Sequence, residues 1–214
     1  MVQGSEPPFV CPLDRTRHVV AGLDEAGCGP LAGSVVAACV VLDPAHAICG
    51  LDDSKRLSAR RREALYEEIT ATARAWGVAA VGAEVIDRIN IRNAALQAMH
   101  EAYLSMGLDC ELLLIDGRST LRTLQDGPQQ LAVVRGDRRA GEIMAASIVA
   151  KVTRDREMLE LDRLYPGYGF ARHKGYPTAE HLRIISRLGI LPCYRRTYAP
   201  VRRLLLQGQG AARA

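Results

Sequence analysis

The chain has 214 residues, of which 48% are hydrophobic, 24% charged and only 5% aromatic. This composition excludes a disordered chain, a collagen-like fibre and a coiled coil, and it predicts a folded domain with an aliphatic core. The net charge of +4 is uneven, because residues 151–214 contribute +8 and residues 1–150 contribute −4, which suggests a polyanion partner or a solvated basic surface.

Residues 1–17 contain three prolines and no basic-then-apolar signal pattern, so we expect a flexible N-terminal arm and no secretory leader. The longest apolar run, residues 34–42, is far shorter than the roughly 20 residues of a membrane span. None of the six cysteines is spaced as CxxC or CxxH. The sequence therefore predicts reduced thiols, no zinc site, no membrane partner and a cytoplasmic location, and we expect a monomer.

The first half of the chain alternates strand-like and helical patterns. Residues 18–24 predict a strand, glycines follow in a tight turn, and residues 34–42 predict a strand buried on both faces. Ser58 is suited to cap a helix that we expect to reach Trp76, with Gly77 as its stop signal. A strand over residues 78–83 and a helix over residues 91–106, stopped by Gly107, follow.

The second half predicts strands over residues 112–116 and 131–134 and then mostly helix. A long helix is expected from Ala140 to about Leu164, where Tyr-Pro-Gly breaks it. Thr178 caps a helix to Leu188, a short helix begins near Pro200, and residues 207–214 predict a loose tail. The pattern favours an α/β fold, with a mixed sheet covered by helices on both faces, in one domain over residues 18–206.

Carboxylates follow three of the predicted strands: Asp24 with Glu25, Asp116, and Asp137. Neighbouring strand ends of an α/β sheet share one crevice, so these four groups converge if their strands are neighbours. Converging carboxylates repel one another, and oxygen ligands favour Mg²⁺ or Mn²⁺ over zinc. Two such ions are the usual arrangement for attack on a phosphodiester. The alternative is that these acids are an exposed strand end and ordinary turns.

Asp24 and Glu25 are adjacent, so in a regular strand their side chains face opposite ways. Both can serve one site only if the strand bends or ends there, which the glycines at positions 27 and 29 permit.

Six motifs occur in order along the chain: residues 21–33 (AGLDEAGCGPLAG), 53–57 (DSKRL), 115–117 (IDG), 134–137 (VRGD), 145–155 (AASIVAKVTRD) and 169–178 (GFARHKGYPT). On these motifs the chain resembles bacterial ribonuclease HII, the type 2 ribonuclease H, over residues 20–204. The resemblance implies a ribonuclease H-like fold with a C-terminal helical extension. It also implies an endonuclease, acting in DNA replication and repair, that uses two Mg²⁺ or Mn²⁺ ions held by Asp24, Glu25, Asp116 and Asp137, with Asp24 bridging both.

The substrates implied by the resemblance are RNA–DNA hybrids and duplex DNA with an embedded ribonucleotide. The cut falls on the 5′ side of the ribonucleotide and leaves a 3′-hydroxyl and a 5′-phosphate. The family senses the 2′-hydroxyl with a Gly-Arg-Gly turn, largely through backbone groups, and here the turn is Gly27-Cys28-Gly29. Because Cys has neither the charge nor the reach of Arg, we expect ribonucleotide selection to survive, whereas phosphate affinity or rate could fall. We expect Cys28 to be inert.

The resemblance also assigns Tyr176 to packing on the sugar of the next nucleotide, and Lys55 and Lys174 resemble phosphate contacts. Asp155 is either an acid near the metals or a helix-surface partner of Lys151. His173 is either a proton shuttle or structural. Two rival functions remain open: an integrase- or resolvase-type nuclease of the same fold, and a hybrid-binding module that has lost catalysis. The four intact acids argue against the second.

Overall fold

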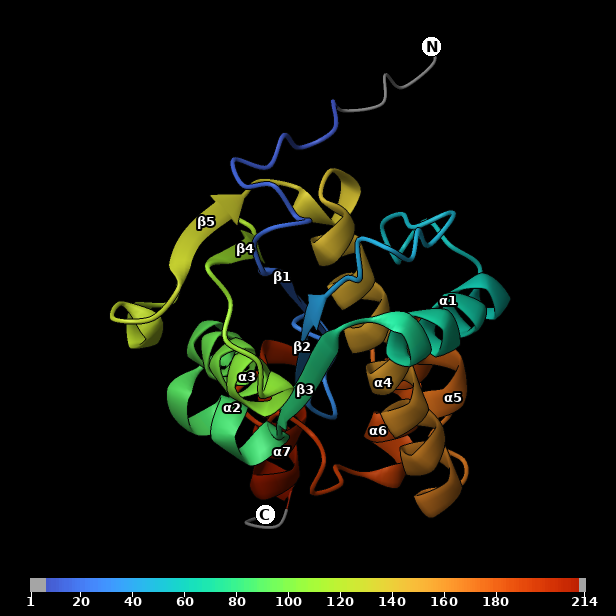
Figure 1. Cartoon of the computed structure of the whole chain (residues 1–214). Coiled ribbons are helices and arrows are strands. Elements are labelled where there is room, and N and C mark those ends of the chain that lie inside the picture. The colour runs from blue at the N-terminus through green and yellow to red at the C-terminus, as the bar shows by residue number, and fades with distance from the viewer. Residues whose placement is uncertain (1–6, 212–214) are drawn as a thin grey trace.

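The structure is a computed structural model that describes residues 7–211. A five-stranded mixed sheet runs through the middle of the molecule (Figure 1). Its strand order is β3-β2-β1-β4-β5. β1 pairs in parallel with β4, and β4 with β5, whereas β2 is antiparallel to both β1 and β3. The strands are β1 (Val20–Ala26), β2 (Val35–Val41), β3 (Ala75–Val81), β4 (Leu112–Asp116) and β5 (Gln129–Val133).

Helices cover both faces of this sheet, which confirms the predicted α/β class (Figure 1). One face carries α2 (Ala83–Ile89) and α3 (Ile91–Met106), and the other carries α1 (Ala59–Thr72) and α4 (Gly141–Leu164). The C-terminal helices, which pack around the end of α4, are α5 (Phe170–His173), α6 (Ala179–Leu188) and α7 (Ala199–Ala211). Two short 3₁₀ helices are η1 (Arg122–Leu124) and η2 (Gly136–Arg138).

The two central strands are packed on both sides. All seven residues of β2 are buried, as expected for a strand covered on both faces. α4 lies directly on β1, because a side-chain carbon at Gly22 would come within 2.1 Å of the Glu142 carbonyl carbon. Only glycine therefore lets the two backbones approach this closely.

The predicted helix boundaries are confirmed where a side chain or a glycine caps the helix. The hydroxyl of Ser58 accepts from the Arg61 amide at 3.2 Å, that of Thr178 accepts from the His181 amide at 3.1 Å, and Gly107 ends α3 with a φ of 68°. The predicted end of α1 was wrong. The helix ends at Thr72, and Trp76 and Gly77 belong to β3. The short helices α2 and α5 were not predicted.

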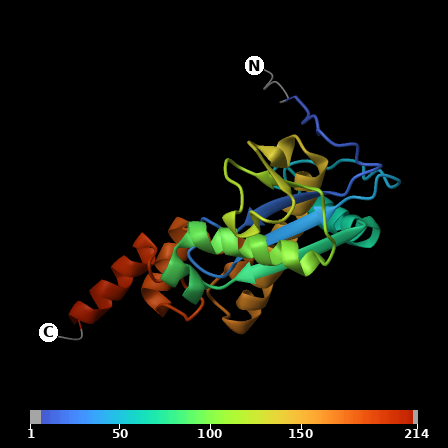
Figure 2. The same cartoon turned by 60° about the vertical axis from the view of Figure 1, so that its left-hand side comes forward.

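Both ends of the chain are more ordered than their composition suggests. Phe9, Cys11 and Leu13 pack against the core beside β4, and Arg15 pairs with Glu142. The described part of the expected flexible arm is therefore anchored, while residues 1–6 lie outside the described range. α7 continues through residues 207–211, where a loose tail was expected, and residues 212–214 lie outside that range. Figure 2 shows α7 projecting from the body of the molecule.

All six cysteines are free thiols in the structure. In the described part of the chain, every helix is too short or too polar to cross a membrane.

Candidate active site

The pairing of β1 with β4 brings Asp24 and Asp116 level with each other. Leu23 lies opposite Ile115 in the parallel register, and the two aspartates are the next residues along their strands. Asp24 is only 5% exposed, and its Oδ1 accepts from the Glu25 amide at 2.7 Å. The sheet therefore places two of the predicted metal ligands at the end of its central parallel pair.

Asp137 comes to this point through a turn after β5. Oδ1 of Asp116 accepts from the Gly136 amide at 2.7 Å, and it also lies 3.4 Å from the Asp137 amide nitrogen. These contacts tie the η2 turn to the end of β4. The fold therefore brings these three aspartates, which come from separate segments of the chain, close together.

The four carboxylates repel one another. Burial raises the pKa of Asp24 well above its usual value, and the charges of Glu25, Asp116 and Asp137 raise it further. Burial and the Asp116 charge likewise raise the pKa of Glu25 and that of Asp137. Full ionisation of Asp24, Glu25 and Asp137 in this shared environment is therefore costly.

β1 continues past Asp24, but beyond that point it is paired with only one neighbouring strand. Its pairing with β4 stops at Leu23, but it follows β2 as far as Ala26. Gly27 then turns the chain with a φ of 97°, and a side-chain carbon there would lie 2.8 Å from Nε of Arg154. The turn brings Cys28 back to Glu25, whose Oε1 lies 3.6 Å from the donating Cys28 Sγ.

The donor set consists of carboxylate oxygens, which fits Mg²⁺ or Mn²⁺. The carboxylates also have protein partners: Glu25 accepts from Cys28, and Oδ2 of Asp137 lies 3.6 Å from the Lys55 Nζ. Within residues 7–211, no three His, Cys, Asp or Glu side chains are close enough to form a ready metal site. The acids are thus close enough to repel one another, although their side chains do not form a ready set of metal ligands in the described chain.

The loop that carries Lys55 is fixed by a buried aspartate. Asp53 is fully buried; its Oδ1 accepts from the Lys55 amide at 2.9 Å, and its Oδ2 accepts from Nε of Arg138 at 3.1 Å. This links the Lys55 loop to the turn that holds Asp137. We had not predicted Asp53 as a site residue; its only signal was its place in the DSKRL motif.

A cavity of about 180 Å³ beside the acids collects the predicted substrate-binding residues. Its lining includes Glu25, Gly27, Cys28, Gly29, Lys55, Asp155, Lys174 and Tyr176. Asp24 and Asp137 do not line it. Asp116 lines an adjoining cavity of about 230 Å³, which Glu25 and Cys28 also border. The acids therefore stand beside the surface where the predicted substrate contacts meet.

Asp155 lies in the wall of this cavity and not among the four acids. Its carboxylate pairs with Lys151, one helical turn earlier, and with Arg62 at 3.6 Å. The pair with Lys151 that the second alternative expects is present. Lys151 and Arg154 also line the cavity and were not singled out as site residues from the sequence.

A fully buried arginine holds the Gly27–Gly29 turn from inside. Arg195 Nη2 donates to the Gly27 carbonyl at 2.7 Å, and Nη1 donates to the Cys28 carbonyl at 3.1 Å. Its other donors reach the carbonyls of Gly33 and Ser34 and the Tyr198 hydroxyl. All five guanidinium N–H groups thus have oxygen acceptors. No sequence signal marked Arg195, because four of its five acceptors are backbone carbonyls more than 160 residues away.

Tyr176 stands at the edge of the cavity, 44% exposed. Behind it, His181 Nδ1 donates to the Tyr176 carbonyl at 2.8 Å and Nε2 accepts from the Tyr194 hydroxyl at 2.7 Å. His173 stacks on His181 with ring centroids 3.8 Å apart. Burial lowers the pKa of His181 to about 4 and also lowers that of His173. Both rings are neutral structural supports, which favours the structural interpretation of His173.

Two strained residues flank the site. Arg135, just before the Gly136–Asp137 turn, has a φ of 55°, and Lys174 has a φ of 51°. Long side chains rarely adopt this left-handed conformation, and it persists only where the surroundings enforce it. Burial lowers the pKa of Lys174.

The Cys28 thiol is shielded. Burial raises its pKa to about 12, and the neighbouring Glu25 charge adds to this shift. A thiol with such a pKa stays protonated at neutral pH and is a poor nucleophile.

Comparisons with known proteins agree on one family. The sequence model of the family "Ribonuclease HII" matches residues 21–201. A ribonuclease HII from Laribacter hongkongensis (strain HLHK9) is 52% identical over 192 residues, covering 90% of this chain and 96% of that protein. The ribonuclease H2 from Pyrococcus horikoshii OT3 has a TM-score of 0.76 at 26% identity, covering 89% of this chain and 98% of that one.

A more distant structure, Bst-RNase HIII in complex with Mn²⁺, has a TM-score of 0.70 at 20% identity, covering 90% of this chain and 71% of that one. This likeness shows a shared fold. The family match and the close relative together cover nearly the whole fold described above. The chain therefore belongs to the ribonuclease HII family and is a nuclease with ribonuclease H activity.

Proposed function

We propose that the protein cleaves the RNA strand of RNA–DNA hybrids and cuts duplex DNA on the 5′ side of an embedded ribonucleotide, leaving a 3′-hydroxyl and a 5′-phosphate. The observation that carries the proposal is the placement of the four acids beside a cavity lined by the Gly27–Gly29 turn and Tyr176. A reaction centre and a surface able to recognise a sugar adjoin each other there.

The catalytic acids of the proposal are Asp24, Glu25, Asp116 and Asp137. They would hold two divalent ions, Mg²⁺ or Mn²⁺, which when bound activate water and stabilise the charge that develops at phosphorus. The all-oxygen donors and the mutual repulsion of the acids support this assignment. So does Mn²⁺ binding by a protein of the same fold.

The turn is proposed to sense the 2′-hydroxyl through its backbone. C=O and N–H of a trans peptide point in opposite directions, so Arg195, by holding the carbonyls of Gly27 and Cys28, turns the amides of Cys28 and Gly29 away from itself. Both residues line the cavity. Two backbone donors held in this way can bind an oxygen of the ribose or its phosphate, whatever side chain stands at position 28.

The remaining residues of the cavity orient the nucleotide. The ring of Tyr176 lies over Gly29, where a side-chain carbon would be 3.4 Å from its Cε1, so the ring and the turn can contact the same sugar. Lys55, Lys174 and Lys151 supply positive charge for phosphates. We further propose that the protein works as a cytoplasmic monomer in DNA replication and repair.

The direct test is cleavage of a duplex that contains one ribonucleotide, run with Mg²⁺, with Mn²⁺ and with EDTA. We expect cleavage 5′ of the ribonucleotide with either metal, none with EDTA, and none of an all-DNA duplex. An Asp116→Asn variant should lose at least a hundredfold in rate, whereas Asp126→Asn, at an exposed acid before β5, should not.

Two results would contradict the proposal. Preferred cleavage of all-DNA junctions would favour the integrase- or resolvase-type alternative. Tight Mg²⁺-independent binding of hybrids without cleavage would favour the non-catalytic alternative.

A further inference from the structure

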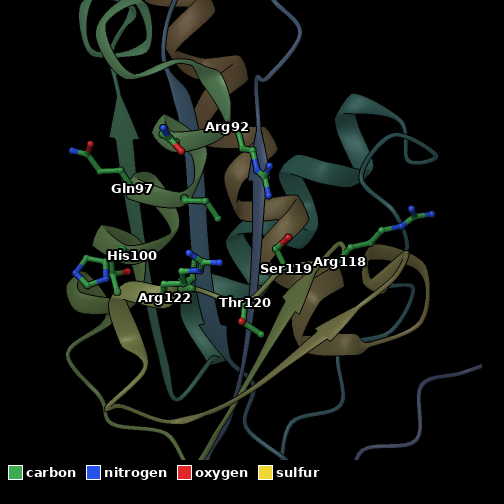
Figure 3. A pocket seen from close by; sticks show the side chains of 11 residues that line it. Arg92, Gln97, His100, Arg118, Ser119, Thr120 and Arg122 are labelled. Carbon is green, nitrogen blue, oxygen red and sulfur yellow. The ribbon is translucent and has the colours of Figure 1, made fainter.

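A third, larger cavity lies on the α3 side of the acids. It measures about 890 Å³ and is enclosed by α3 and the loop that follows β4 (Figure 3). Its polar lining includes Arg92, Gln97 and His100 from α3 and residues 118–120 and Arg122 from the loop. None of these residues belongs to the motifs from which we predicted the active site.

The charge of this cavity is one-sided. Arg92, Arg118 and Arg122 all line it, and no acid does. Within residues 7–211, these three exposed guanidinium groups form neither a hydrogen bond nor an ion pair with the protein. His100 adds an Nδ1 atom that is buried and has no hydrogen-bond partner in the described chain. Three uncompensated cations and an unpaired polar atom indicate a site for an anionic ligand.

This cavity is continuous with the reaction centre. It shares Arg92, Leu96, Arg118 and Ser119 with the 230 Å³ cavity that Asp116 and Glu25 line. That cavity in turn shares Glu25 and Cys28 with the cavity of Tyr176. The three cavities therefore follow one another from Tyr176, past the acids, to Arg122.

We propose that Arg92, Arg118 and Arg122 bind backbone phosphates of the substrate duplex on the opposite side of the cleaved bond from Tyr176. The inference rests on the proposed function, because it assigns a course to the same substrate. A single phosphate fills only a small part of 890 Å³, whereas each strand of a duplex presents one roughly every 3.4 Å along the axis. Arginine binds phosphate through paired N–H donors without reading sequence. We call this set of residues the distal arginine site.

The test combines an Arg118→Gln/Arg122→Gln variant with a series of duplexes that carry one ribonucleotide and are shortened stepwise from either end. For the full-length duplex we expect the variant to raise KM about tenfold, more than it lowers kcat. The slope of log affinity against log salt should become shallower by about 2, since each lost phosphate contact contributes about 0.9. Arg74→Gln, at an exposed arginine by the opposite end of the sheet, should match the wild type.

The duplex series separates this inference from the proposed function. Shortening the arm that reaches the distal arginine site should weaken binding by the wild type as much as the double substitution weakens binding of the full-length duplex. The same shortening should not weaken binding by the double variant any further. The inference would be overturned if shortening that arm weakened binding equally in the wild type and the variant. It would also be overturned if the wild-type KM did not depend on the length of that arm. Failure of the wild type to cut any ribonucleotide-containing duplex would instead overturn the proposed function.

Discussion

Arg195 donates to the Gly27 carbonyl at 2.7 Å from the protein interior, although 168 positions separate the two residues. The same guanidinium reaches Cys28, and the Tyr198 hydroxyl donates to the Cys28 carbonyl at 2.7 Å. The turn proposed to meet the 2′-hydroxyl is therefore positioned by the segment after α6, and not by its own side chains.

Tyr198→Phe tests this positioning with a small change. The variant loses the hydrogen bond to the Cys28 carbonyl and the one that the hydroxyl accepts from Arg195. Its free energy of unfolding should therefore fall by about 1–3 kcal/mol. If the bond also sets the direction of the turn, cleavage at a single ribonucleotide should fall more than tenfold. Urea unfolding and single-turnover cleavage measure the two effects. Tyr66→Phe, whose ring contacts Arg156, is the control. A stability loss with unchanged cleavage would assign Tyr198 a purely structural role.

Cys28 should resist alkylation and tolerate replacement. Because burial and Glu25 raise its thiol pKa to about 12, iodoacetamide at pH 8 should modify the exposed Cys49 long before Cys28. Peptide mass spectrometry over time gives both rates. Cys28→Ser should retain cleavage within about threefold, since the backbone of the turn is held by Arg195. Rapid modification of Cys28 in the folded protein would contradict the shielding described above.

Stability should fall on acidification below pH 6.5. The folded-state pKa of His181 is lowered to about 4, so between these values the unfolded chain binds a proton that the folded chain excludes. The stability from the neutral ring is complete above pH 6.5 and is lost as the pH falls toward 4, by about 1.4 kcal/mol per pH unit. Chemical unfolding at several pH values measures the slope. His181→Asn should flatten it, whereas His46→Asn, at an exposed position, should not.

Removing charge from the acid cluster should stabilise the metal-free protein. Asp24 is buried beside three other carboxylates that raise its pKa, so its ionised form is unfavourable at neutral pH. Asp24→Asn should therefore raise the free energy of unfolding in EDTA by about 1–3 kcal/mol while abolishing cleavage. Addition of Mg²⁺ should stabilise the wild type more than the variant. A variant that is less stable than the wild type in EDTA would show that the repulsion is weak.

Local patterns predicted those parts of the fold that depend on local interactions. The burial of β2, the caps at Ser58 and Thr178 and the bounds of α3 follow from periodicity and capping chemistry. The end of α1 did not, because the apolar spacing that continues to Trp76 suits a helix as well as the start of β3. Tertiary pairing of β3 with β2 decided between them.

The residues of the candidate site likewise fall into those that the sequence predicted and those that it did not. Acids after apolar runs were visible in the sequence. The fold brings Asp24 from β1, Asp116 from the end of β4 and Asp137 from the η2 turn together. Arg195 was not visible, because it binds backbone carbonyls more than 160 residues away. His181 was not visible either, because its partners, the Tyr176 carbonyl and the Tyr194 hydroxyl, form no recognisable sequence pattern. The distal arginine site was hidden for a similar reason, since α3 and the loop after β4 meet only in the folded chain.

The pairing of β1 with β4, which ends at Leu23, limits which changes in sequence length the protein can tolerate. The register of the β1–β4 ladder, whose last pair is Leu23 with Ile115, keeps Asp24 and Asp116 level with each other. A one-residue insertion or deletion in either strand would put Asp24 and Asp116 out of step and turn one of them to the other face of the sheet. Length changes in these two strands should therefore inactivate the enzyme more completely than point substitutions around them.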